Sequence, residues 1–210
     1  ILITYGDSVI KTGQAPLQTL KNFLDKNIKD TINSVHILPF FPYSSDDGFS
    51  VIDYSSVNES LGSLQDITDI SQNYQLMSDL VINHCSSRSA WFDNFIKGEG
   101  QGHDFFFTAQ LDDDLSNVVR PRTSPLLKEV VTGQGQKFVW CTFSQNQVDF
   151  DFRNHEGLKA FTSIIPQYLD SGVKISRFDP LAFLWNIVWS DYIELPQNQI
   201  VVTLIRHLFD

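Results

Sequence analysis

Short apolar segments rich in β-branched residues alternate along this chain with segments whose apolar residues recur every three or four positions. Residues 35–40, 76–82 and 173–178 are the clearest short apolar segments, and each has the length of a β-strand. Strands that are apolar throughout must be covered on both faces, so the alternation predicts a parallel sheet flanked by helices, an α/β fold. The helices are expected at 16–32, 63–74, 89–97 and 156–171, with a last helix that begins at Pro196.

Two details of these helices follow from particular residues. Pro166 lies inside the segment 156–171 and should kink that helix, because proline lacks a backbone N–H and its ring clashes with the preceding turn. In the last helix, Ile200, Leu204 and Leu208 have the spacing of one helical face and are expected to point inward.

Two architectures fit four strand–helix units in 210 residues. The first is a partial (β/α)8 TIM barrel, about its first four βα units, since a whole barrel needs roughly 250 residues. The second is a complete, small doubly wound sheet, although no glycine-rich nucleotide-binding motif supports it. The stretch 98–152 is rich in Gly, Asp, Asn and Pro and interrupts the alternation, which predicts a small inserted domain after the third strand. The expected parts are therefore 1–85 and 153–210 for the barrel and 86–152 for the insertion.

The composition excludes several classes of protein. Hydrophobic residues make up 42% and charged residues 19%, which is typical of a globular chain and not of a disordered one. With 15 Lys and Arg against 25 Asp and Glu, the net charge is −10, so no nucleic acid partner is expected. No apolar run approaches the roughly 18 residues of a membrane span, and no secretory signal opens the chain. We therefore expect a cytoplasmic protein with no membrane partner, whose Cys85 and Cys141 are free thiols.

Polar residues gather where the expected strands end, the edge at which parallel α/β folds bind ligands. Asp46 lies in the loop after the second strand, and His84 follows the third. Arg177 and Asp179 close the fourth strand. Residues two apart on a strand point to the same side, so Arg177 can hold Asp179 ionised and oriented, as a carboxylate nucleophile requires. Each signal alone has a structural alternative: an ion pair for the Arg-x-Asp pair, a turn for Asp46 and a hydrogen-bonded strand end for His84.

Two segments carry motifs that can be matched to a family. Residues 79–84 read Asp-Leu-Val-Ile-Asn-His, and residues 172–179 read Gly-Val-Lys-Ile-Ser-Arg-Phe-Asp. The chain thereby resembles glycoside hydrolase family 13, the α-amylase superfamily, with its motifs Asp-x-x-x-Asn-His and Gly-x-x-x-x-Arg-x-Asp. Residues 183–185 and 195–197 are more similar to the glucosylglycerate and glucosylglycerol phosphorylases than to enzymes specific for sucrose. The stretches that resemble the sucrose phosphorylase branch as a whole are 3–8, 36–42, 48–49, 120–122, 139–143 and 147–149.

The resemblance implies a (β/α)8 barrel that carries out retaining chemistry on an α-glucoside. Asp179 matches the nucleophile that attacks the anomeric carbon, and Arg177 matches the residue that steadies it. Phosphate then takes the glucosyl group and gives α-glucose 1-phosphate, and the two displacements retain the anomer. Arg122, together with Arg120, lies where the family places phosphate-contacting groups, a role that suits the guanidinium fork. The positions that match the glucose-binding pocket are Asp46, Phe49, His84 and Phe183.

The chain also departs from the family pattern. The acid/base Glu of the family ends the fifth strand, which this chain does not reach, and general acid catalysis supplies roughly 10²–10⁴-fold in rate. We therefore expect the chain alone to be inactive. Pro180 replaces the usual Ala after the nucleophile and restricts Asp179. The first residue, Ile1, is not Met, which favours a fragment, and open sheet edges predict a poorly soluble chain.

Three hypotheses about function remain open on the sequence. In the first, the chain is the N-terminal portion of a phosphorylase whose partners are inorganic phosphate and an α-glucoside, either sucrose or a glucosyl-glycerate or glucosyl-glycerol donor. In the second, it belongs to a hydrolase or transglucosidase of the same superfamily. In the third, it is a non-catalytic remnant. No cofactor and no metal are expected, because the 5 histidines show no zinc-like spacing and the phosphorylase branch does not generally use calcium.

Overall fold

The computed structural model describes every residue except 120, 186–194 and 208–210. The chain divides into two compact units made of interleaved segments, because the path leaves the first unit near the end of one strand and returns to it later. Unit 1 contains Ile1–Leu80 and Ile164–Phe178, and unit 2 contains Val81–Ser163 and Asp179–Asp210.

Unit 1 is built on a four-stranded sheet in the order β1-β2-β3-β9. β1 pairs in parallel with β2, and β2 pairs in parallel with β3. All four residues of β2 are buried, as expected for a strand that is covered on both faces. The strands predicted at 35–40, 76–82 and 173–178 are thus confirmed, with ends that differ by one to three residues. The strands are β1 (Leu2–Thr4), β2 (Ser34–Ile37), β3 (Gln75–Val81) and β9 (Val173–Asp179).

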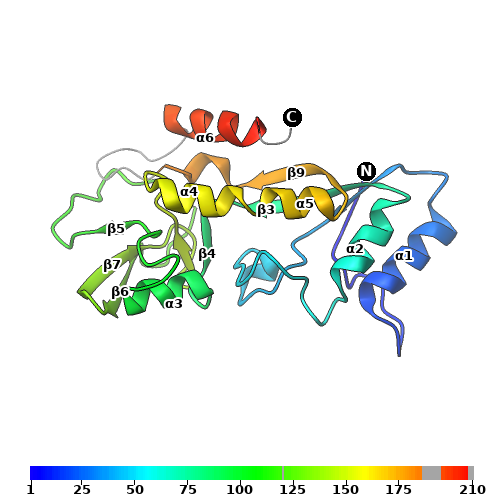
Figure 1. Cartoon of the computed structure of the whole chain (residues 1–210), viewed down its shortest axis with the longest axis horizontal. Helices are drawn as coiled ribbons and strands as arrows, with labels where there is room; N and C mark the ends of the chain where they lie inside the picture. Colours follow the sequence, from blue (N-terminus) through cyan, green and yellow to red (C-terminus); the bar gives the residue numbers. More distant parts are fainter. Residues whose placement is uncertain (120, 186–194, 208–210) are drawn as a thin grey trace. The chain divides into compact units, whose positions relative to one another are not determined.

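The first two helices of unit 1 lie next to each other (Figure 1). Leu17, Leu20 and Leu24 form the buried face of α1, each 1% exposed or less, because they recur at the helical period. The start of α2 is fixed by Ser63, whose backbone N–H donates to the Asp66 carboxylate at 2.8 Å. Both helices end earlier than the sequence predicts. The helices of unit 1 are α1 (Pro16–Asn27), α2 (Leu64–Ser71) and α5 (Ile165–Asp170).

Unit 2 contains two small antiparallel sheets, β4-β8 and β5-β7-β6, and α3 packs beside β6 (Figure 1). Aromatic rings fill its interior. Phe106 stacks on Phe150 at 5.5 Å between centroids and meets Phe92 edge-on at 5.1 Å. The stretch 98–152 thus contributes buried rings to unit 2, and the inserted domain stays a prediction. The elements of unit 2 are β4 (His84–Ser86), α3 (Ala90–Lys97), β5 (Thr108–Ala109), β6 (Leu127–Thr132), β7 (Gly135–Trp140), β8 (Gln147–Asp149), α4 (His155–Thr162) and α6 (Pro196–Arg206).

The segment 156–171 is two helices and not one kinked helix. α4 ends at Thr162, and α5 begins at Ile165. Pro166 lies in the first turn of α5, where the missing N–H has no intrahelical partner to lose. The predicted kink is therefore a complete break.

The inward face predicted for the last helix is wrong. Ile200 and Leu204 are 68% and 44% exposed, whereas Val201 and Ile205 are buried. Two apolar stripes on α6 share the helical period, and spacing alone does not say which of them packs on the core. Leu208, the third residue of the predicted face, lies outside the described residues.

Candidate active site

A buried carboxylate on β3 links the strands on either side of it in unit 1. Asp79 is 1% exposed; one oxygen accepts a hydrogen bond from Nε2 of His36 on β2 at 2.8 Å. Its other oxygen pairs with Nη1 of Arg177 on β9. A carboxylate can only accept, so the His36 Nε2 carries a proton. Asp79 on β3 thus fixes the position of the Arg177 guanidinium on the neighbouring strand, β9.

The loop after β2 has an unusual backbone. Asp46, Asp47 and Gly48 have φ angles of 58°, 48° and 103°, a left-handed conformation that non-glycine residues rarely adopt. A Cβ atom at Gly48 would lie 2.8 Å from Cβ of Pro39 and 2.9 Å from its carbonyl oxygen, so only glycine fits there. Close packing therefore sets the conformation in which the loop presents Asp46.

Phe49 and Tyr5 place this loop near the buried ion pair. The guanidinium carbon of Arg177 lies 6.0 Å from the centroid of the Phe49 ring. Burial raises the pKa of Tyr5, and the negative charges of nearby carboxylates, among them Asp79 and Asp46, raise it further. Unit 1 thus brings three predicted residues, Arg177, Phe49 and Asp46, into one neighbourhood.

A hollow of about 300 Å³ opens beside the same loop. Tyr5, Tyr43, Asp47 and Asn58 are among the residues that line it. Hydroxyl, carboxylate and amide groups of this kind can form hydrogen bonds with a ligand rich in hydroxyl groups.

Unit 2 holds His84 and Phe183, which are connected through Phe143. The ring centroids of His84 and Phe143 are 5.3 Å apart, and those of Phe143 and Phe183 are 5.6 Å apart with planes at 88°. Nδ1 of His84 is hydrogen-bonded to Oδ1 of Asn83, and Nε2 lies 3.1 Å from Nε2 of Gln147. His84 is 2% exposed, so these side chains determine how its ring is oriented.

Asp179 is the last residue of β9, as the sequence predicts. Its carbonyl oxygen accepts a hydrogen bond from the backbone N–H of Ile82 at 3.0 Å, and the peptide bond to Pro180 is cis. Arg177 forms an ion pair with Asp79. A pairing of Arg177 with Asp179 therefore stays a prediction.

Arg122 and Arg120 are the two arginines predicted to contact phosphate. Arg122 is exposed between β5 and β6, and Arg120 lies outside the described residues. Their role stays a prediction.

Four residues near these positions had no role in the prediction: Asp79, His36, Phe143 and Gln147. Asp79 and His36 are polar residues inside apolar strands, and polar groups buried in a sheet need partners. That signal could have identified them. Phe143 and Gln147 carry no such signal, because their places beside His84 depend on how β4 pairs with β8.

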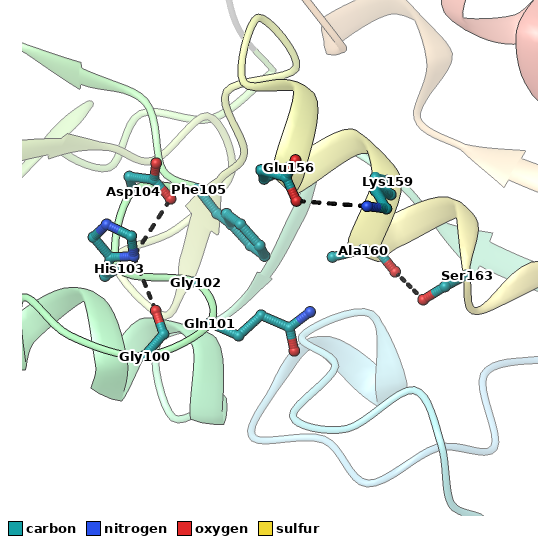
Figure 2. Close-up of a pocket in the computed structure, with 10 residues that line it drawn as sticks. All are labelled: Gly100, Gln101, Gly102, His103, Asp104, Phe105, Glu156, Lys159, Ala160 and Ser163. Atoms are coloured by element: carbon teal, nitrogen blue, oxygen red, sulfur yellow. Dashed lines mark hydrogen bonds and ion pairs between the residues drawn. The ribbon is translucent and has the colours of Figure 1, made fainter.

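A second hollow, of about 420 Å³, lies in unit 2 between the loop 100–105 and α4 (Figure 2). Gln101 extends from the loop toward α4, where Lys159 faces Glu156 at 4.0 Å. None of the predicted site residues is among its lining residues.

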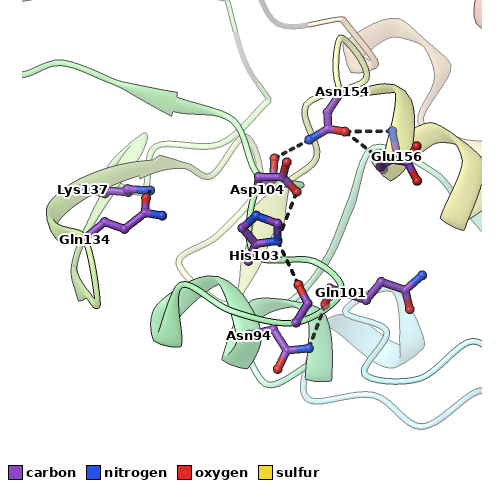
Figure 3. A network of polar contacts seen from close by, with 10 residues as sticks. Asn94, Gln101, His103, Asp104, Gln134, Lys137, Asn154 and Glu156 are labelled. Atoms are coloured by element: carbon purple, nitrogen blue, oxygen red, sulfur yellow. Dashed lines mark hydrogen bonds and ion pairs between the residues drawn. The ribbon is translucent and has the colours of Figure 1, made fainter.

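Backbone contacts hold the loop beside this hollow (Figure 3). Nδ1 of His103 lies 2.9 Å from the carbonyl oxygen of Gly100, and Asn94 donates to that of Gln101 at 2.8 Å. Asn154 donates to the carbonyl oxygen of Asp104, at the other end of the loop, at 2.9 Å. The loop is thus tied to both α3 and the start of α4.

The described part of the chain contains no cluster of three His, Cys, Asp or Glu side chains that could bind a metal ion. Among the same residues, no helix has the length and apolar character needed to cross a membrane. Cys85 and Cys141 are free, as predicted, and both are buried.

Residues 24–202 match the family described as "Alpha amylase, catalytic domain". The chain belongs to this family. The resemblance that was inferred from the two motifs is therefore confirmed.

Curated relatives of this α-amylase family chain include several phosphorylases. Glucosylglycerate phosphorylase of Spirochaeta thermophila is 46% identical over 206 residues, which cover 98% of this chain and 35% of that enzyme. Glucosylglycerate phosphorylase of Escherichia coli is 36% identical over 211 residues, covering 100% of this chain and 38% of that enzyme. The chain thus has a phosphorylase relationship, and it spans little more than a third of the length of these relatives.

Solved structures agree with the family assignment. The crystal structure of sucrose 6F-phosphate phosphorylase from Thermoanaerobacter thermosaccharolyticum matches with a TM-score of 0.88 and 28% identity, covering 98% of this chain and 44% of that one. A trehalulose synthase MutB structure matches with a TM-score of 0.82 at 20% identity, covering 98% of this chain and 41% of that one, which shows the fold alone. The predicted α/β class is confirmed, and the fold matches the TIM-barrel enzymes of the α-amylase family.

Proposed function

We propose that this chain is part of a retaining α-glucoside phosphorylase, which transfers a glucosyl group from a glucosylglycerate-type donor to inorganic phosphate and gives α-glucose 1-phosphate. The observation that carries the proposal is the 46% identity, over 98% of the chain, with the glucosylglycerate phosphorylase of Spirochaeta thermophila. Sucrose and glucosylglycerol are the alternative donors, because a sucrose phosphorylase of Agrobacterium vitis and a glucosylglycerol phosphorylase of Marinobacter adhaerens are 31% and 30% identical.

In this proposal Asp179 is the nucleophile and Arg177 orients it. Support comes from the anchoring of Arg177 by the buried Asp79, and from the position of Arg177 two residues before Asp179 on the same strand. Asp179 attacks the anomeric carbon, and the glycosidic bond breaks, which releases the non-glucosyl part of the donor. Phosphate then attacks the same carbon from the face opposite Asp179, and the bond between Asp179 and the glucosyl group breaks. The leaving oxygen takes its proton from the acid/base Glu, which we place in a part of the enzyme beyond this chain.

The residues proposed to bind glucose are Asp46, Phe49, His84 and Phe183. Asp46 and Phe49 belong to the loop after β2, and His84 and Phe183 flank Phe143 in unit 2. Carboxylate and imidazole groups can bind sugar hydroxyls, and aromatic rings can pack on the apolar face of the sugar. Phosphate is assigned to two arginines, Arg122 and Arg120.

The proposal includes an arrangement of the whole enzyme. The chain supplies about the first four βα units of a TIM barrel, with 1–85 and 153–210 in the barrel and 86–152 as an inserted domain. It is an N-terminal portion and is inactive alone, because it lacks the proton donor. The enzyme works in the cytoplasm, without cofactor or metal.

The test is a product assay on the complete protein that this gene encodes. The protein is incubated with glucosylglycerate, sucrose or glucosylglycerol, each with and without inorganic phosphate, and α-glucose 1-phosphate and free glucose are measured. Formation of α-glucose 1-phosphate that requires phosphate, fastest from glucosylglycerate, is the expected result. Free glucose formed at a rate independent of phosphate would support the hydrolase or transglucosidase alternative, and no product from any donor would support the remnant.

A pair of matched variants tests the nucleophile. Asp179→Asn should lower the rate of phosphorolysis by at least roughly 10³-fold, because it removes the group that forms the covalent intermediate. Asp170→Asn is the control, since Asp170 is an exposed carboxylate at the end of α5. Equal rates for the two variants would contradict the assignment of Asp179.

A further inference from the structure

Asp149 is a carboxylate with no exposed surface, at the end of β8 in unit 2. One of its oxygens accepts a hydrogen bond from the backbone N–H of Thr142 at 3.0 Å. The other accepts from the hydroxyl of Thr142 and from Nδ2 of Asn83 at 3.2 Å. Burying a carboxylate is costly unless donors converge on it, and these donors meet that need.

The hydrogen bond that Asn83 donates to Asp149 sets the orientation of the Asn83 amide. With Nδ2 directed at the carboxylate, Oδ1 of Asn83 faces Nδ1 of His84, to which it is hydrogen-bonded. A carbonyl oxygen can only accept, so Nδ1 of His84 carries a proton. Without the carboxylate, the two ends of the amide would differ little in their surroundings, and the opposite orientation would present an N–H to His84.

The other ring nitrogen of His84 faces a second side-chain amide, that of Gln147. The hydroxyl of Ser144 donates to Oε1 of Gln147 at 2.7 Å, which leaves Nε2 of Gln147 facing Nε2 of His84 at 3.1 Å. The amide donates, so Nε2 of His84 accepts. These contacts therefore favour a form of the ring that carries its proton on Nδ1.

We propose that Asp149 is a positioning residue for His84. Acting through Asn83, it fixes the orientation of the imidazole ring and keeps its proton on Nδ1. Only the significance of His84 for glucosyl binding rests on the proposed function; the positioning itself is a property of the chain without ligand.

The chain offers a matched control two residues further on. Asp151 pairs with Arg153 through bonds of 2.7 and 2.6 Å, and the Arg153 side chain is 51% exposed. Asp151→Asn thus removes the same charge from nearly the same place in the sequence, without touching Asn83. Thr142→Val is a second control, because it removes a hydrogen bond to Asp149 and leaves both the carboxylate and Asn83 in place.

The experiment is nitrogen-15 NMR of the imidazole rings, recorded without ligand on the complete protein that this gene encodes. In the wild type, His84 should show its proton on Nδ1; a signal for the form protonated only on Nε2 would overturn the proposal at once. In Asp149→Asn, the Nδ1 proton should exchange with water roughly tenfold faster or the ring should change tautomer, as expected for loss of a charged hydrogen bond. Asp151→Asn and Thr142→Val should leave the His84 signals as they are in the wild type.

A double variant separates positioning from a general loss of structure. In the Asn83→Ala background, adding Asp149→Asn should leave the His84 signals unchanged, because the connecting residue is already absent. A further change of the same size as in the single variant would refute the role of Asn83. Should Asp149→Asn not fold, Asp149→Glu takes its place, and the wild-type tautomer remains decisive. No glucoside is present, so these results and the product assay can fail independently.

Discussion

Replacing Asp79 by Asn should destabilise unit 1 strongly while changing its shape very little. The carboxylate accepts from His36 through one oxygen and from Arg177 through the other. An amide offers one acceptor and one N–H₂ group, so one of the two donors loses its partner. His36 is 3% exposed and has little access to water, whereas the Arg177 side chain is 41% exposed and can be solvated.

The size of the effect follows from these contacts. Loss of a hydrogen bond to a charged group costs about 1.5–3 kcal/mol, and breaking a fully buried ion pair costs about 3–5 kcal/mol. Because Arg177 is partly exposed, we expect a loss of about 2–4 kcal/mol in the free energy of unfolding. With a urea m-value of about 2–3 kcal/mol/M for a chain of this size, the unfolding midpoint should fall by about 1 M.

Urea unfolding followed by far-ultraviolet circular dichroism measures this shift, because the helices and strands of unit 1 contribute to that signal, whereas unit 1 contains no tryptophan. Asp30→Asn is the control, since Asp30 is an exposed carboxylate after α1 and a surface change of this kind usually stays within about 0.5 kcal/mol. If the midpoint of Asp79→Asn moved no further than that of Asp30→Asn, the argument that a buried carboxylate holds Arg177 would be refuted.

Other predictions concern the loop after β2, a pH-dependent carboxylate and the thiols. Gly48→Ala should lower the free energy of unfolding in urea by about 2 kcal/mol or more, because a Cβ would lie 2.8 Å from a neighbouring atom. Gly13 also has a positive φ but no atom within 4 Å of such a Cβ, so Gly13→Ala should lower it by only about 1 kcal/mol. Equal losses would contradict the packing argument. Burial raises the pKa of Asp53, but hydrogen bonds from two serines lower it further than burial raises it, so its net pKa lies below the usual value. Its contribution to stability is therefore present at neutral pH and lost as the pH falls through that lowered pKa, so Asp53→Asn should destabilise the chain at pH 7 and have little effect in strong acid; a difference independent of pH would argue against this. Burial raises the pKa of Cys85 to about 12, and Cys141 is buried too, so a thiol reagent at pH 8 should label neither in the native chain and both in denaturant; rapid native labelling would show that the thiols are accessible.

The strands of the sheet could be predicted because a strand covered on both faces needs consecutive apolar residues, and β2 and β3 have them. Arg177 and His84 could be identified as site candidates because each lies at or next to the end of an apolar segment. The partner of Arg177 could not be predicted in the same way. Its pairing with Asp79 depends on β9 lying next to β3, and spacing along the chain does not encode that order.

Positions that depend on contacts between distant segments escaped prediction for a similar reason. Asp149 looks like any polar residue at the end of a short strand, and only the pairing of β4 with β8 brings it to Asn83. The face of α6 was wrongly predicted because Ile200 and Val201 are equally apolar, and the core alone decides which of them is covered.

The interleaving of the two units limits how this polypeptide can be divided. Unit 1 takes β9 from a segment that follows 81–163, so no deletion from either end isolates it. A gene for unit 1 alone would have to fuse Leu80 to Ile164. A stop codon anywhere within 81–163 would produce a chain in which Asp79 is made without Arg177, and premature termination there would leave the central carboxylate of the sheet without its counterion.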